Sequence, residues 1–148
     1  MTRHKPPGGP TADSPEDIEA QFYEALQKAD LERLMAVWAD EDEIVCVHPG
    51  GPRTVGLAAI RASFESIFAN GAIPVVPELV QRLHSLSCAV HHLSERIGVQ
   101  TDDGPRTARV VATNVYLKTP QGWRLVVHHA SPGALEERGT GERRSTLH

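Results

Sequence analysis

Histidines are the residues of this sequence best suited to moving protons. His48 ends an apolar run and precedes Pro49 and two glycines, and His128 and His129 close the segment "GWRLVVHHASP". An imidazole has an unperturbed pKa of about 6.5, so it can accept or donate a proton at neutral pH. Neighbouring residues on a strand point to opposite faces, so only one of His128 and His129 can face a given pocket.

Other kinds of chemistry have weaker signals. The sequence has no HxH or HExxH spacing, and a metal site would need His48, His128 and a carboxylate to converge, so we expect no metal and no cofactor. His91 and His92 are adjacent on a strand pattern and cannot chelate one ion together, which favours solvent or interface positions for them. His84 carries no further signal. A nucleophile motif and a phosphate-binding loop are also missing.

Composition bounds the class of protein. The 148 residues are 40% hydrophobic without a long apolar run, which predicts one domain with no membrane span or secretory signal, in the cytoplasm. The net charge of −4, with no basic stripe, argues against a nucleic-acid partner. Cys46 and Cys88 lie in apolar runs and are expected to be buried thiols. We predict a disordered leader over 1–13, a domain over 14–133 and a flexible tail over 134–148.

The order of predicted elements is three helices followed by a strand meander. Ser14 can cap the first helix with Pro15 at its first position, and Asp30 can cap the second. The predicted helices span 14–30, 30–42 and 56–71, and the predicted strands span 43–48, 77–87, 88–100, 106–118 and 122–131. This is an α+β order, which indicates a curved antiparallel sheet with helices packed on one face and room for a cavity between them.

Several segments in this order carry a family resemblance. "FYEALQKADLERLMAVWADEDEIVCVHPGGPRTVGLAAIRASF" followed by "ATNVYLKTPQGWRLVVHHASP" resembles the SnoaL-like branch of the superfamily that includes nuclear transport factor 2 and ketosteroid isomerase. The resemblance covers roughly residues 16–132. It implies a cone-shaped barrel, usually a homodimer, with one lumen per subunit, and it leaves the activity open because this fold hosts enzymes, ligand binders and assembly modules.

The register of the last hairpin predicts which residues face the lumen. If Lys118 pairs with Gly122, then Asn114 lies opposite Val126 and Ala112 opposite His128. Because the family's lumen often holds a few polar groups, we assign Asn114 and His128 to it. The more apolar face, which we expect to form the dimer, then carries Trp123, Leu125, Val127 and His129. A one-residue change in the turn would reverse these faces.

The resemblance also suggests roles for other residues. His48 falls at the strand end where ketosteroid isomerase has its general base, and Asn114 falls within a residue of that enzyme's protonated aspartate. Phe22 stands where the isomerase has a tyrosine that binds the oxyanion, and phenylalanine cannot donate that hydrogen bond. We therefore expect His48, Asn114 and His128 as candidate catalytic residues. Phe22, Trp38 and Tyr116 are the candidate ligand-binding residues.

Four functions fit these observations. The leading hypothesis is a small, largely apolar molecule bound in the lumen, with acid–base catalysis of isomerase, lyase or hydrolase type left open. The others are ligand binding without chemistry, a homodimeric assembly module similar to the kinase association domain, and a peptide-docking domain shaped like nuclear transport factor 2.

Overall fold

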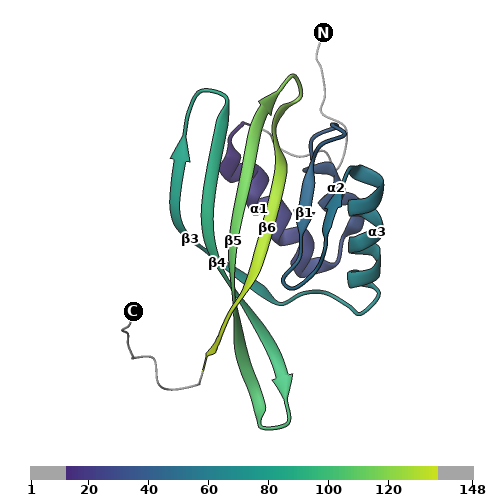
Figure 1. The fold of residues 1–148 in the computed structure, drawn as a ribbon, viewed down its shortest axis with the longest axis vertical. Helices are drawn as coiled ribbons and strands as arrows, with labels where there is room; N and C mark the ends of the chain where they lie inside the picture. The colour runs from purple at the N-terminus through teal and green to yellow at the C-terminus, as the bar shows by residue number, and fades with distance from the viewer. Residues whose placement is uncertain (1–12, 137–148) are drawn as a thin grey trace.

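The computed structural model describes residues 13–136 and contains three helices and six strands in one α+β unit (Figure 1). Most of the predicted leader and tail therefore lies outside the described residues. Strand β6 continues to Glu136, three residues past the predicted domain end at 133. None of the helices in the described part of the chain is long and apolar enough to cross a membrane.

The first two helices begin where their capping residues predict. The Ser14 side chain accepts a hydrogen bond from the Asp17 N–H at 3.1 Å, and α1 runs over Pro15–Lys28. Asp30 caps α2 by accepting from the Arg33 N–H at 3.2 Å. Helix α2 spans only Leu31–Ala36, shorter than predicted, because Trp38 leaves the helix to form a bridge with Leu125 of the sheet. Helix α3 spans Leu57–Phe68.

The sheet has the strand order β2-β1-β6-β5-β4-β3. Its strands are β1 Val45–Val47, β2 Arg53–Val55, β3 Val75–His84, β4 Cys88–Thr101, β5 Gly104–Thr119 and β6 Gly122–Glu136. The sheet is mixed rather than purely antiparallel, because β1 runs parallel to β6. The short strand β2 was not predicted. Otherwise the curved sheet packed on three helices confirms the predicted fold class.

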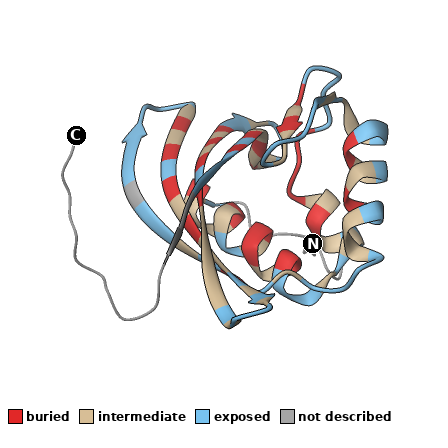
Figure 2. Ribbon diagram, turned by 60° about the horizontal axis from the view of Figure 1, so that its bottom comes forward, coloured by how far each residue is buried: buried red, intermediate tan, exposed pale blue. Residues whose placement is uncertain are grey.

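The core lies between the concave face of the sheet and α1. Buried residues alternate with less buried ones along β4 and β5, as expected for strands with one face toward a core (Figure 2). Ile18 and Phe22 of α1 are fully buried, as are Tyr116 of β5 and Leu125 of β6. This inner face therefore holds the side chains that can form an enclosed site.

The predicted register of the β5–β6 hairpin is wrong by one residue at the turn. Thr119 pairs with Gly122, so the loop is only Pro120 and Gln121, and the Thr119 hydroxyl stabilises it by donating to the Gly122 carbonyl at 2.7 Å. As a consequence Trp123 and Leu125 point into the core instead of forming an outer face.

A β-bulge then shifts the register a second time. Tyr116 pairs with Leu125, but the next pair along is Val115 with Val127, so Val126 is the extra residue. The second shift places His128 opposite Asn114, with both side chains buried on the inner face, while His129 is exposed on the outer face. Together the two shifts move the pairing by two residues, and a shift of two restores the face because side chains alternate along a strand. The inward position predicted for His128 therefore agrees with the structure although the pairing behind it does not.

Candidate functional site

A cavity of about 140 Å³ lies between the helices and the inner face of the sheet. Its polar lining side chains are those of His48, Glu95 and His128, which come from the end of β1, from β4 and from β6. The remaining lining is apolar and consists of Phe22, Leu26, Pro49, Phe64, Ile67, Ile73, Val75 and Ile97. An apolar pocket with a few convergent polar groups is the usual form of a small-molecule site.

Glu95 is the buried carboxyl group of this cavity. Strand alternation places it on the inner face of β4 together with Leu93, and it is 5% exposed. The Tyr23 hydroxyl donates to its Oε2 at 2.6 Å. Burial raises the pKa of Glu95, and the hydrogen bond from Tyr23 opposes part of that rise. A carboxyl group with a raised pKa is a stronger base when ionised and stays available as a proton donor to higher pH than an ordinary carboxyl group.

His128 is held in one tautomer by its neighbours. Asn114 donates from Nδ2 to the Tyr23 hydroxyl at 3.2 Å, which leaves the Asn114 Oδ1 to face His128 Nδ1 at 2.6 Å. An amide oxygen only accepts, so the proton of the neutral imidazole lies on Nδ1 and Nε2 keeps its lone pair. That Nε2 lies 4.0 Å from Glu95 Oε2. Burial lowers the pKa of His128 to about 3, so the ring is neutral at physiological pH.

His48 supplies the third polar group from the end of β1. Its Nε2 lies 2.6 Å from Ser63 Oγ of α3, and its ring packs edge-on against Phe64 with centroids 4.9 Å apart. The turn behind it is closed by the Gly51 N–H donating to the His48 carbonyl at 2.8 Å. Burial lowers the pKa of His48, so this ring is also biased toward its neutral form.

Comparison with known proteins identifies the family. The model of the SnoaL-like domain matches residues 16–135. This chain belongs to the SnoaL-like domain family. Among curated proteins no sequence matches it significantly.

Solved structures agree with this assignment of the SnoaL-like domain. A Thiobacillus denitrificans protein, provisionally named a calcium/calmodulin-dependent protein kinase type II association domain, is 34% identical, with 84% of this chain and 99% of that one covered and a TM-score of 0.76. A Streptomyces avermitilis protein of the nuclear transport factor 2-like family, provisionally named a dehydratase, is 33% identical over 79% and 92%, with a TM-score of 0.68. A ketosteroid isomerase-like protein from Erwinia carotovora atroseptica is 19% identical over 80% and 93%, with a TM-score of 0.69, and shows the shared fold.

The structure brings together some of the residues that the sequence singled out. His48, His128 and Phe22 line the cavity of the SnoaL-like domain, and Asn114 lies behind His128 as its hydrogen-bond partner. Two candidate ligand-binding residues, Trp38 and Tyr116, do not line it. Trp38 packs against Phe22 in the core, with ring centroids 6.5 Å apart.

The sequence interpretation missed Glu95 and Tyr23. Glu95 alternates with Leu93 and Ile97, so a carboxyl group on the apolar side of β4 was the available signal. Tyr23 follows Phe22, the residue that the resemblance placed at the isomerase tyrosine position. Its hydroxyl is nevertheless the one that reaches the site, because it donates to Glu95.

The buried neutral His128 predicts a pH-dependent stability. The unfolded chain protonates this residue below about pH 6.5, whereas the folded domain does so only at about pH 3. The unfolded state therefore binds more protons in this window, and the free energy of unfolding should fall as the pH falls, by up to about 1.4 kcal/mol per pH unit. Urea denaturation at several pH values between 7 and about 4 should show that the free energy of unfolding depends less steeply on pH in His128→Gln than in the wild type. The exposed His129 provides the control. If the free energy of unfolding had the same pH dependence in His128→Gln and His129→Gln, the assignment of His128 as a buried neutral histidine would be contradicted.

Proposed function

We propose that this SnoaL-like domain binds a small, largely apolar carbonyl compound in the cavity and transfers a proton on it, with Glu95 as the acid–base residue. The observation that carries this proposal is the position of Glu95, whose carboxyl group lines an apolar cavity, accepts a hydrogen bond from Tyr23 and has a raised pKa. Perturbed carboxyl groups in clefts are typical of catalytic acids and bases.

The other polar groups complete the proposed reaction. The Glu95 carboxylate removes a proton from the carbon next to the substrate carbonyl, the C–H electron pair moves toward the carbonyl oxygen, and an enolate forms. His48 polarises that oxygen as an N–H donor from Nδ1, while its Nε2 accepts from the Ser63 hydroxyl 2.6 Å away. Glu95 then returns the proton to another carbon, as an isomerase does, or to a leaving hydroxyl, as a lyase does. His128 Nε2 accepts a hydrogen bond from the protonated carboxyl group after a small closure of the present 4.0 Å gap.

The size of the cavity restricts the substrate. Its volume of about 140 Å³ is close to that of an engineered apolar cavity of about 150 Å³ that binds benzene. Pockets for drug-sized ligands start at about 300 Å³. The proposed substrate is therefore a single ring or a short chain rather than a steroid nucleus. The 33% identity to the protein named provisionally as a dehydratase supports the lyase form of the reaction.

Deuterium exchange on a simple ketone tests the proposed chemistry. Cyclohexanone in D₂O should exchange its α-protons faster with the protein than with buffer alone, followed by proton NMR. Glu95→Gln keeps an oxygen for Tyr23 but cannot take up a proton, so the protein-dependent rate should fall by at least about 100-fold. Protein chemical shifts would measure cyclohexanone binding separately.

The control for this experiment is Glu78→Gln on the outer face, where Glu78 pairs with Arg96 at 3.0 Å. It should leave the exchange rate unchanged. Unchanged exchange in Glu95→Gln, or exchange no faster than in buffer despite binding, would contradict catalysis by Glu95. Absence of cyclohexanone binding would contradict the proposed ligand class.

A second proposal concerns assembly, and the outer face of the sheet favours it. Trp123 and Leu125, which the sequence placed on this face, are buried in the core instead. The face still carries Val111 and Leu117 of β5, which are 57% and 39% exposed. Val127 and His129 of β6 lie on the same side. We propose that a second copy of the chain covers these residues. The 34% identity to the protein provisionally named a kinase association domain supports an assembling role.

Light scattering tests the dimer. The wild-type protein should have twice the 16.1 kDa mass of one chain, whereas Val111→Glu should shift it toward the monomer because a carboxylate would be buried in the interface. Leu86→Glu is the control, since Leu86 is 94% exposed in the turn between β3 and β4 and its loss should not change the mass. A wild-type monomer at high micromolar concentration would overturn this proposal.

A further inference from the structure

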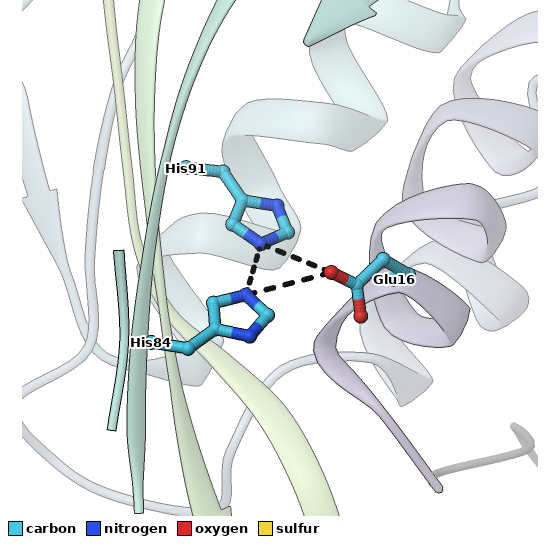
Figure 3. Close-up of side chains that lie close together, drawn as sticks. All are labelled: Glu16, His84 and His91. Carbon is cyan, nitrogen blue, oxygen red and sulfur yellow. Dashed lines mark hydrogen bonds and ion pairs between the residues drawn. The ribbon is translucent and has the colours of Figure 1, made fainter. Parts of the chain in front are cut away.

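Two histidines and a glutamate meet away from the cavity. His84 of β3 and His91 of β4 lie on the inner face of the sheet, and Glu16 of the first turn of α1 approaches them (Figure 3). The two Nε2 atoms are 3.0 Å apart, and Glu16 Oε2 lies 3.4 Å from the His84 Nε2 and 3.7 Å from that of His91. The expected solvent or interface position of His91 is wrong, because its side chain is fully buried.

A second carboxylate orients His91. Glu19, one turn further along α1, has its Oε1 2.6 Å from His91 Nδ1, and the same oxygen accepts from the Tyr116 hydroxyl at 2.7 Å. With its Nδ1 proton donated to this carboxylate, the His91 Nε2 presents a lone pair toward His84 and Glu16. A carboxylate behind a histidine in this way is the usual support of a metal-binding imidazole.

We propose that His84, His91 and Glu16 bind a divalent transition-metal ion, with Zn²⁺ as the best match. Ligand atoms on a tetrahedron about 2.1 Å from a zinc ion are about 3.4 Å apart. The three separations between the ligand atoms, 3.0, 3.4 and 3.7 Å, bracket that value. The two imidazole nitrogens favour zinc over calcium and magnesium, which prefer all-oxygen ligands, and zinc also accepts a carboxylate oxygen.

Metal binding would require small rearrangements of the side chains around Glu16, His84 and His91. Arg82 donates to Glu16 Oε2 at 2.7 Å and must release it, and its side chain is 53% exposed, so it can turn into solvent. The Nε2 atoms of His84 and His91 face each other, with the proton on His84. On binding, this proton moves to the His84 Nδ1, and both rings turn their Nε2 lone pairs toward the ion. Since the side chains of His84 and Glu16 are 37% and 39% exposed, the fourth position is open to a water molecule.

The proposed ion would connect α1 to the edge of the sheet. Its ligands come from α1, β3 and β4, and none of them lines the cavity. The proposed metal site is therefore separate from the proposed proton-transfer chemistry. An ion bound only by the folded protein adds its binding free energy to stability, so Zn²⁺ should also raise the melting temperature.

Calorimetric titration with ZnCl₂ tests the site, using untagged protein in which His4 and His148 are replaced by alanine so that the chain ends add no imidazole. We expect one Zn²⁺ per chain with a dissociation constant below about 10 µM. His84→Ala removes an exposed ligand without opening the core and should weaken binding at least tenfold. Glu16→Gln should weaken it similarly, and Glu19→Gln by about 10- to 100-fold. Co²⁺ in place of Zn²⁺ should give the visible absorption of a tetrahedral site.

The matched control is His92→Ala. His92 is adjacent to His91 on β4 but is exposed on the opposite face, so its loss should leave zinc affinity and the zinc-dependent rise in melting temperature unchanged. The proposal would be overturned by no detectable binding at 100 µM Zn²⁺, roughly tenfold above the expected constant. It would equally be overturned if His84→Ala kept the wild-type affinity, or if His92→Ala lost as much affinity as His84→Ala.

Discussion

The hydrogen bond from Tyr23 to the buried Glu95 is the interaction on which the candidate site depends. A carboxyl group in an apolar cavity is costly unless it is hydrogen-bonded, and Tyr23 meets that need at 2.6 Å. Because the tyrosine proton is committed to Glu95, its oxygen accepts from Asn114, and the free amide oxygen then accepts from His128. The direction of each hydrogen bond in this chain therefore determines the direction of the next one. The last bond leaves the lone pair of His128 Nε2 facing Glu95.

Helix α1 holds both polar clusters because it carries two stripes on its sheet-facing side. Ile18, Phe22 and Leu26 form the apolar stripe that packs in the core. Glu16, Glu19 and Tyr23 recur at spacings of three and four, which aligns them as a polar stripe. That stripe meets His91 and Tyr116 at one end and Glu95 and Asn114 at the other. Packing of this one helix thus sets the geometry of the cavity and of the proposed metal site.

The helix starts and the fold class could be predicted from the sequence, but the strand register and most of the site could not. Ser14 and Asp30 place the helix starts because a capping side chain acts within three residues, and the family resemblance supplies the cone. The hairpin register depends on one residue of turn length and on the bulge at Val126, which no periodicity reveals, so Trp123 and Leu125 were placed on the wrong face. The roles of Glu95 and His91 depend on side chains of α1 that are distant in sequence. Tyr23 lies 72 residues before Glu95, and Glu19 lies 72 residues before His91.

The most direct measurement is the protonation state of His128 by ¹⁵N NMR across a pH titration. The hydrogen-bond chain from Glu95 through Tyr23 and Asn114 requires a proton on Nδ1 and a bare Nε2. With its pKa lowered to about 3 by burial, the ring should keep that tautomer unchanged from neutral pH down to about pH 4. A His128 that titrates at about pH 6.5, or one whose proton lies on Nε2, would contradict the account.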